Sequence, residues 1–259
     1  MADTPAPSSS AWQSALTRIR SQFSFRNDVT ALDIDQRMLR VVHVSTGRTP
    51  GSTSIKRIEV VPVPSEGFDL ENPKEVGEWI GEQLKALHLV PGTVVMAARR
   101  GEAVLKELLL PPLKDAGEMA SMVNMRAARE LPFPEADAVI DFTVTKVPTK
   151  KELKAARKET PQPGAATDIK AHIVVAAVRR DTVNRYLTIT ESAGLKLTGL
   201  GLRPLASFRA LNACVPEING NAVALISVRR HEVDVDILID GRLVFSRELS
   251  VNLEEPEDV

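Results

Sequence analysis

Hydrophobic and polar positions alternate most clearly near the end of the chain, where they indicate three consecutive strands. Over residues 233–239, apolar side chains alternate with aspartates at the two-residue period of a half-buried strand. An apolar run at 222–228 precedes this segment, and Asp240-Gly241 predicts a hairpin turn into a third strand. Residues 28–64 repeat the order of strand, turn, strand, turn and strand. We therefore expect two similar β-meanders about one domain length apart.

A helix and a buried strand follow the first meander. Asn72 suits the N-cap of this helix, and Pro73 suits its first position. Pro91-Gly92 ends the helical pattern, and residues 93–98 form the continuous apolar run of a strand buried on both faces. These elements predict an α/β layer. The apolar stripe of the helix consists of Val76, Trp79, Ile80, Leu84 and Leu87.

The middle of the chain contains two further strand patterns, at residues 104–110 and 138–144. Between them, Asp115 and Glu118 resemble a capping box, which predicts the start of another helix. Pro132 is expected to end this helix, because proline cannot donate the next backbone hydrogen bond.

The α/β pattern returns after residue 168. Residues 169–178 and 195–202 are expected to form strands, and residues 203–215 a helix. Asp181 is expected to cap the helix between the two strands, and Gly194 fits its C-terminal stop.

Composition limits the classes of protein to which the chain can belong. Its 259 residues, 43% of them hydrophobic, are enough to bury a core. Lys plus Arg number 33 against 34 for Asp plus Glu, so net charge gives no argument for nucleic-acid binding. Cys214 is the one cysteine, and it is expected to be a buried structural thiol in a reducing compartment. Neither a membrane-spanning run nor the apolar core of a signal peptide is present, which predicts a cytoplasmic protein.

Two segments have no strand or domain-core pattern. Residues 1–10 are small and polar, which predicts disorder, and residues 148–168 are rich in Lys, Glu and Pro, which predicts a mobile basic loop. Between residues 11 and 26, arginines accompany an apolar stripe at helical spacing. This basic amphipathic segment is expected either to cover the protein's own surface or to contact a membrane or partner. Its stripe consists of Trp12, Ala15, Leu16, Ile19 and Phe23.

Four segments, at 31–44, 109–142, 173–211 and 224–249, resemble the PilM family of type IV pilus assembly, within the actin-like ATPase superfamily. The second is the most specific, because Pro-Pro-Leu, an acidic helix and Pro-Phe-Pro followed by Asp-Phe are similar to the inserted subdomain of that family. The cytoplasmic domain of GspL, from type II secretion, is a related alternative.

The resemblance implies an α/β, actin-like (RNase H-like) ATPase fold with two lobes, an inserted α+β subdomain and an incomplete second lobe. Residues 1–28 would be the disordered or amphipathic N-terminal segment and 29–110 the first lobe. Residues 111–168 would be the inserted subdomain with its basic loop, 169–218 the return to the first lobe and 219–259 the start of the second lobe.

The resemblance also implies a degenerate nucleotide site in the two hairpins. Asp33 matches the residue that helps to place hydrated magnesium, whereas Asp35 stands where the family has a glycine close to phosphate. A carboxylate about 4 Å from a phosphate charge is repelled by roughly 4 kcal/mol at an effective dielectric near 20. In the second hairpin, Ser227 and Arg229 replace an aspartate and a glycine. Arg229 or Arg230 can attract phosphate but cannot restore a backbone cradle.

No cofactor, catalytic residue or metal ligand is therefore expected, although weak binding of ATP with magnesium is compatible with the residues left. The four histidines are scattered, without carboxylates or a cysteine at metal-ligand spacing. The residues of the degenerate ATP site are Asp33, Arg40, Ser227, Arg229 and Asp234.

The function implied by the resemblance is that of a cytoplasmic scaffold peripheral to the inner membrane. It would bind the N-terminal tail of a PilN-like membrane protein and link it to a cytoplasmic motor ATPase, with self-association as a further expectation. The alternatives are an active actin-like ATPase and a GspL-like secretion component. The expected partner-binding residues are Met119, Met122, Met125, Arg126, Arg129, Pro132 and Phe133.

Overall fold

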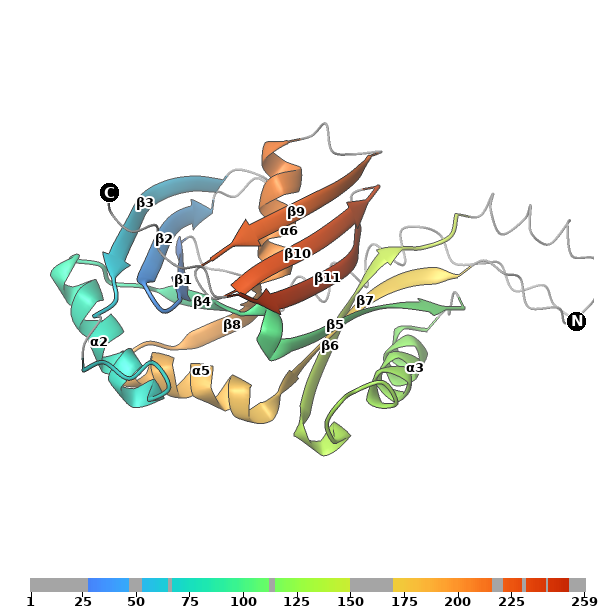
Figure 1. Cartoon of the computed structure of the whole chain (residues 1–259), viewed down its shortest axis with the longest axis horizontal. Helices are drawn as coiled ribbons and strands as arrows, with labels where there is room; N and C mark the ends of the chain where they lie inside the picture. The colour runs from blue at the N-terminus through green and yellow to red at the C-terminus, as the bar shows by residue number, and fades with distance from the viewer. Residues whose placement is uncertain are drawn as a thin grey trace, which may run out of the picture. The chain divides into compact units, whose positions relative to one another are not determined.

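The structure is a computed structural model that describes residues 28–46, 53–64, 67–111, 115–149, 170–215, 221–229, 232–240 and 242–251 (Figure 1). The predictions for residues 1–27, for the basic loop at 148–168 from residue 150 on, for Arg230 and for residues 252–259 lie outside these ranges. The chain forms two compact units. The first unit contains the described residues of 19–99 and 179–206, and the second contains those of 100–178 and 207–259. The predicted domain boundaries stay predictions.

The first unit is built on a five-stranded mixed sheet of order β3-β2-β1-β4-β8. β1, β2 and β3 form the predicted antiparallel meander, and β1, β4 and β8 run parallel to one another. Leu32, Leu39 and Val41 are each 2% exposed or less, so the meander is part of a packed core. The strands are β1 (Asp28–Ile34), β2 (Met38–Thr46), β3 (Thr53–Pro62), β4 (Thr93–Ala98) and β8 (Leu197–Leu202).

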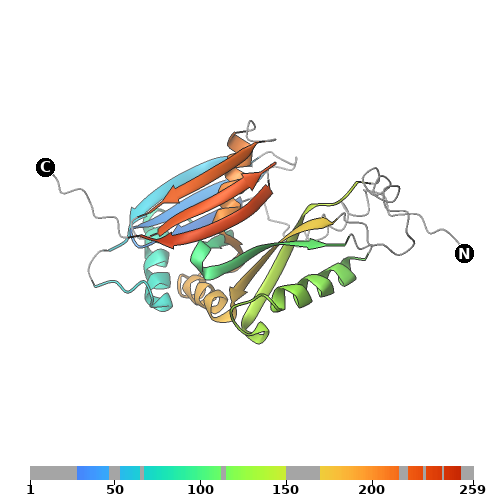
Figure 2. The same cartoon turned by 45° about the vertical axis from the view of Figure 1, so that its right-hand side comes forward.

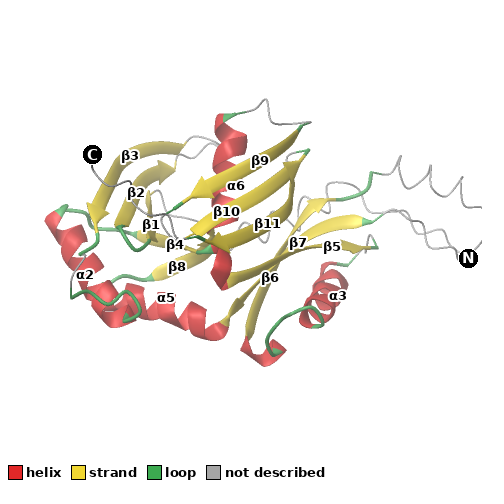
Figure 3. Cartoon of the chain, viewed as in Figure 1, coloured by secondary structure: helices red, strands yellow, loops and turns green. Residues whose placement is uncertain are grey.

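The predicted helix after the first meander is α2 (Pro73–Ala86), and its start is as expected (Figure 3). The Asn72 side chain accepts hydrogen bonds from the amides of Lys74 and Glu75, at 3.2 and 3.4 Å, which satisfies two donors of the first turn. Val76, Ile80 and Leu84 are buried on one face, as the predicted stripe requires, while Trp79 and Leu87 are half-buried.

Helix α5 (Arg180–Ser192) corrects one prediction. Asp181 is not its N-cap, because the cap position is Arg179 and the helix begins two residues earlier than expected. The Asp181 carboxylate instead accepts a hydrogen bond from the amide of Thr182 at 2.7 Å, within the first turn. The predicted stop is confirmed, since Gly194 follows the helix with a φ of 72°, a left-handed conformation that glycine adopts without strain.

The second unit contains a sheet of order β5-β7-β6 and the helix α3 (Ala116–Ala128). The Asp115 side chain accepts a hydrogen bond from the Glu118 amide at 2.9 Å, as the capping pattern predicts. The core between sheet and helix consists of Leu108, Leu110, Met119, Val123, Ala127, Ile173 and Val175. The strands are β5 (Ala103–Leu110), β6 (Ala138–Lys146) and β7 (Ala171–Arg179).

The second meander is the remaining sheet of this unit, of order β11-β10-β9 (Figure 2). Its strands are β9 (Ala222–Val228), β10 (Glu232–Ile239) and β11 (Arg242–Ser250), and the helix α6 (Arg203–Cys214) precedes them in the chain. The predicted two-residue period of β10 is confirmed. Asp234, Asp236 and Leu238 are buried on one face of β10, whereas Ile239 is 41% exposed. The buried face of this strand thus carries the aspartates, which the alternation alone did not reveal.

Cys214, at the end of α6, is exposed, so the prediction of a buried structural thiol is wrong. The apolar spacing that predicted α6 does not continue into a buried face at this end, because Ala213, Cys214 and Val215 are all exposed.

Candidate functional site

The turn between β1 and β2 is closed by one of its own side chains. The carboxylate of Asp35 accepts hydrogen bonds from the amides of Arg37 and Met38, at 2.8 and 2.9 Å. The Asp35 amide donates to the carbonyl of Met38 at 3.1 Å. Backbone amides of such a turn are the donors that an anion would need. An internal carboxylate already uses two of them here.

Electrostatics stabilise this arrangement. Burial alone would raise the pKa of the Asp35 carboxyl, but hydrogen bonds from the Arg37 amide, the Arg40 guanidinium and the Met38 amide outweigh burial. The pKa of Asp35 therefore lies below its usual value. Arg40 Nη1 is 2.6 Å from Asp35 Oδ2, so the charge of Asp35 is compensated within the hairpin.

Both oxygens of Asp33, the expected magnesium-placing residue, contact guanidinium groups. Arg203 donates to Oδ1 from Nε at 3.1 Å and from Nη2 at 2.8 Å. Arg40 donates to Oδ2 at 3.3 Å. The Arg203 side chain is 7% exposed, and its Nη2 also lies 3.4 Å from the carbonyl of Ile34. A hydrated cation at Asp33 would have to compete with these arginines.

Sequence reasoning missed Arg203, although a signal was available. β1, β4 and β8 are parallel, so their carboxyl ends meet at one edge of the sheet. Asp33 is the penultimate residue of β1, and Arg203 directly follows β8. A charged residue directly after a parallel strand is a candidate partner for one at the end of its neighbour.

The second hairpin, between β9 and β10, also contains an internal ion pair. Arg229 Nη1 lies 2.8 Å from Asp234 Oδ2 and 2.9 Å from Glu232 Oε1. The Arg229 amide donates to the Glu232 carbonyl at 2.8 Å, which closes the turn. Ser227 is opposite Asp234 in the strand register. The structure thus brings Ser227, Arg229 and Asp234 together, with two carboxylates balancing the arginine.

Next to this hairpin, the aspartates of β10 form a buried acidic pair. Asp234 and Asp236 are 3% and 1% exposed, and Oδ1 of each has no hydrogen-bond partner among the described residues. Burial and the Asp234 charge raise the pKa of Asp236, although a hydrogen bond with Ser246 and the charges of Arg100 and Arg229 partly oppose this shift. Negative charge here disfavours an added phosphate.

Arg100 joins a short 3-10 helix, η1 (Arg100–Glu102), to β11. Its Nε is 2.6 Å from Ser246 Oγ, and its Nη1 donates to the carbonyl of Ala103 at 2.6 Å. Burial lowers the pKa of Arg100, while Asp236, Asp234 and Glu248 act in the opposite direction. The arginine supplies positive charge beside the buried aspartates.

The structure divides the expected partner-binding residues into buried and exposed ones. Met119 is 2% exposed and belongs to the core beneath α3, and Met122 is partly buried against that core. Met125 is 56% exposed. Of the others, Arg126, Arg129 and Pro132 are exposed, and Phe133 is half-buried. The exposed members are the ones a partner can reach without rearrangement of α3.

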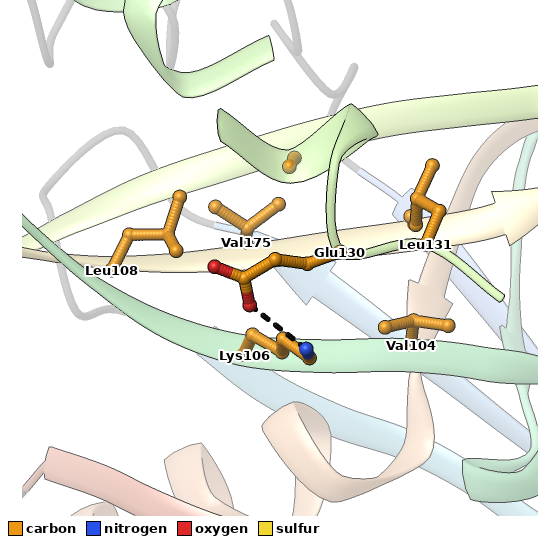
Figure 4. A pocket seen from close by; sticks show the side chains of 8 residues that line it. Val104, Lys106, Leu108, Glu130, Leu131 and Val175 are labelled. Carbon is orange, nitrogen blue, oxygen red and sulfur yellow. Dashed lines mark hydrogen bonds and ion pairs between the residues drawn. The ribbon is translucent and has the colours of Figure 1, made fainter. Parts of the chain in front are cut away.

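A small apolar pocket lies beside the end of α3, against β5 and β7 (Figure 4). Lys106 Nζ and Glu130 Oε2 are 2.8 Å apart at this pocket. The hydrogen bond and the charge of Lys106 lower the pKa of Glu130. The sequence pattern gave no indication of this pocket, since its walls come from three separate segments. It is lined by Val104, Lys106, Leu108, Ala127, Glu130, Leu131, Val175 and Ala177.

No cluster of metal-ligating side chains occurs in the described part of the chain. Across the same ranges, every helix is too short or too polar to cross a membrane.

An antiparallel meander extended by two parallel strands, a second meander later in the chain, and a sheet-and-helix insertion define an actin-like α/β protein. The chain belongs to the PilM family, because the model for "Type IV pilus assembly protein PilM" matches residues 31–252. The predicted fold class and family are thus confirmed. A comparison with curated proteins gave no match.

Two solved structures illustrate the likeness. A PilM–PilN type IV pilus biogenesis complex is similar to this chain with a TM-score of 0.69 at 23% identity, over 86% of this chain. The chain spans 62% of the length of that relative. The cytoplasmic domain of EpsL, an inner membrane component of the type II secretion system of Vibrio cholerae, matches with a TM-score of 0.48 at 10% identity. That match covers 87% of this chain and 71% of the EpsL domain.

Proposed function

We propose that this protein is a scaffold of type IV pilus assembly that binds the N-terminal tail of a PilN-like membrane protein and does not turn over ATP. Family membership and the likeness to a PilM–PilN complex support the pilus assignment. The scaffold acts at the cytoplasmic face of the inner membrane and links the PilN-like protein to a cytoplasmic motor ATPase. Self-association is a further part of this proposal.

The proposal that this protein does not turn over ATP rests on one observation: the turn amides and the Asp33 carboxylate of the first hairpin already have hydrogen-bond partners within the protein. The Asp35 carboxylate accepts hydrogen bonds from two turn amides. Arg203 donates to one oxygen of Asp33, and Arg40 donates to the other. A phosphate would have to compete with a carboxylate for the amides, and a magnesium ion with two arginines for Asp33. The second hairpin presents Arg229 already paired with Asp234 and Glu232.

The surface around the end of α3 supports the proposal that the tail of a PilN-like membrane protein binds here. Leu131 and Val104 line an apolar pocket, and the Lys106–Glu130 pair supplies one positive and one negative group beside it. Met125 is exposed on the preceding turns of the helix. Such a surface fits a short peptide that inserts an apolar side chain and makes polar contacts along its backbone.

The test is the affinity of a fluorescently labelled peptide that carries the N-terminal tail of a PilN-like membrane protein from the same organism. We expect Met125→Asp and Leu131→Asp each to weaken binding at least about tenfold, since a carboxylate at an apolar contact costs on the order of 1.4 kcal/mol or more. Val90→Asp is the matched control, because Val90 is 92% exposed in the first unit.

Fluorescence anisotropy measures the affinities, and circular dichroism checks that each variant is folded. Failure of the peptide to bind the unmodified protein would overturn the docking proposal. Equal affinities for Leu131→Asp, Met125→Asp and Val90→Asp would move the docking site away from α3.

A further inference from the structure

Three polar side chains meet where the second meander contacts the β5-β7-β6 sheet. Glu107 comes from β5, His172 from β7 and Arg242 from the start of β11 (Figure 1). His172 Nδ1 lies 2.7 Å from Glu107 Oε1 and 2.9 Å from Arg242 Nη1. The same Nη1 lies 3.3 Å from Glu107 Oε1. All three residues belong to the second unit, and we call them the histidine cluster.

The strands bring Glu107 and His172 to one face of their sheet. Leu108 and Ile173, each next to one of them in sequence, pack in the core beneath α3. Successive side chains of a strand point to opposite faces, so Glu107 and His172 lie on the face turned away from α3. The register of β5 and β7 makes the two residues diagonal neighbours on that face. Arg242 reaches them from the second meander.

The three contacts of the histidine cluster cannot all be hydrogen bonds in one protonation state. A guanidinium group only donates, whereas Nδ1 of a histidine either carries a hydrogen or offers a lone pair. When Nδ1 offers a lone pair, Arg242 can donate both to it and to Glu107. When Nδ1 carries a hydrogen, it can donate to Glu107 at 2.7 Å, but it then faces another donor, Arg242, at 2.9 Å.

Protonation of His172 also changes the balance of charge. With a neutral ring, the cluster holds one negative and one positive group, Glu107 and Arg242. An imidazolium ring gains a charge-assisted hydrogen bond with Glu107 and is repelled by Arg242. The three side chains are between 20% and 25% exposed, so solvent protons can reach the ring while water screens the charges only in part.

We propose that protonation of His172 releases Arg242, and with it the start of β11, from the β5-β7-β6 sheet. When His172 is neutral, its Nδ1 accepts from Arg242, which also donates to Glu107. When the ring is protonated, His172 donates to Glu107 and Arg242 turns away from the ring. Histidine is the side chain that ordinarily changes charge between about pH 5 and 8, so this contact responds to acidification of the solution.

Other contacts of β11 limit the release to the start of the strand. Leu243 follows Arg242 and is 5% exposed. Further along, Arg100 Nε lies 2.6 Å from Ser246 Oγ, a contact without a histidine. The next charged residue of β11 after the cluster is Arg247, beyond this second contact. The strand is therefore held at two places, and protonation of His172 weakens one of them.

Other charged groups of the β5-β7-β6 sheet titrate outside this range or lie on the other face. Asp141 of β6 shares the face of His172, because the residues on either side of it pack against the core beneath α3. Its carboxylate is exposed and accepts a hydrogen bond from the Phe142 amide at 2.8 Å. Carboxylates ordinarily titrate near about pH 4. Lys106 lies on the face toward α3, paired with Glu130.

Hydrogen exchange measured by mass spectrometry tests the proposal, with rates normalised to the intrinsic rate of each amide at each pH. From pH 8.0 to pH 5.5, we expect exchange at residues 242–245 to rise several-fold and exchange at residues 246–250 to stay unchanged. His172→Gln should abolish the rise, because glutamine does not titrate. Arg242→Met should give fast exchange at both pH values, because the released contact is already lost.

The matched control is His43→Gln, in the first unit. His43 Nδ1 lies 2.9 Å from Thr30 Oγ1, so this variant also removes a histidine with one short polar contact. The rise at residues 242–245 should persist in it.

A second measurement reads the proton itself. The ¹⁵N NMR shifts of histidine rings distinguish a nitrogen that carries a hydrogen from one that does not, and His172→Gln assigns the signal among the four histidines. At pH 8.0 we expect His172 to carry its hydrogen on Nε2. In Arg242→Met the hydrogen should move to Nδ1, because Glu107 is then the group that Nδ1 contacts.

Three outcomes would overturn the proposal. The first is a His172 ring of the unmodified protein that carries its hydrogen on Nδ1 at pH 8.0. The second is equal exchange at residues 242–245 at the two pH values. The third is a rise that persists in His172→Gln, which would assign the response to another titrating group.

Discussion

At the scale of single residues, this protein pairs the charged groups of its first hairpin with partners of its own. Asp35 accepts from two amides of its own turn, and Asp33 accepts from Arg203 and Arg40. These contacts are local to one hairpin and the strand ends beside it. They therefore stabilise the fold of the first unit directly, and removing Arg203 leaves Asp33 with Arg40 as its one remaining guanidinium contact among those described above.

Arg203→Met tests this role. Because Arg203 is 7% exposed and compensates Asp33, we expect the substitution to lower the free energy of unfolding by about 3–5 kcal/mol. Urea unfolding followed by circular dichroism measures the change. Arg179→Met is the control, since its partner Asp181 is largely exposed and surface pairs contribute about 0–1 kcal/mol. Equal losses in the two variants would contradict a special role for Arg203.

Asp236→Asn tests the buried acidic pair. Burial raises the pKa of Asp236, so the folded state binds a proton more tightly than the unfolded state. Stability of the unmodified protein should therefore fall as pH rises from the ordinary aspartate pKa through the raised pKa of Asp236. The neutral asparagine should remove that loss and stabilise the protein at pH 7, while making little difference at pH 3.

Thermal unfolding across pH 3–8 measures this effect, with the exposed Asp141→Asn as its control. A pH profile of Asp236→Asn that is parallel to that of the unmodified protein would show that Asp236 does not titrate in this range.

At the scale of elements, the contact between α2 and α5 depends on two glycines one helical turn apart. A Cβ atom at Gly77 would collide with the carbonyl oxygen of Ile189, and one at Gly81 would come within 3.0 Å of the Ala193 carbonyl oxygen. Both obstacles are backbone atoms, which cannot rotate away. The two glycines thus allow the helices to approach more closely than larger residues would.

Gly77→Ala should therefore destabilise the protein, although alanine favours a helix over glycine by about 1 kcal/mol. We expect a net loss of about 1–3 kcal/mol from overpacking, measured by urea unfolding. Gly92→Ala is the matched control, because a Cβ there meets no atom within 4 Å. An unchanged free energy of unfolding in Gly77→Ala would mean that α5 can move away from α2 at little cost in stability.

At the scale of the whole molecule, both hairpins that would contribute to an actin-like nucleotide site have their charges paired internally. We therefore expect isothermal titration calorimetry with ATP and magnesium to show no binding in the micromolar range. Asp35→Gly combined with Arg203→Ala should increase any weak binding, because it frees two turn amides and leaves Asp33 with Arg40 alone. Micromolar affinity of the unmodified protein would contradict the proposed loss of nucleotide binding.

Features that depend on neighbouring residues were predictable from the sequence. The two-residue period located β10, the repeated order of strands and turns located the first meander, and Asn72 and Asp115 marked the starts of α2 and α3. The prediction that Asp181 caps α5 was wrong, because Arg180 already has helical geometry and Asp181 therefore lies inside the first turn. The hairpin positions of Asp33 and Asp234 came from the family resemblance, and the structure shows what each carboxylate contacts.

By itself, the sequence determined the order of helices and strands, the capped starts of α2 and α3 and the family, because periodicity, capping and motifs are local properties of the chain. The tertiary structure alone decided three further matters. It placed Arg203 on Asp33, 170 positions away, and it paired β5 with β7 across a long intervening segment. It also turned the aspartates of β10 inward, where Arg100, Arg229 and Ser246 compensate Asp236 in part. Alternation gives the two faces of a strand, and only the groups packed against them decide which face is buried.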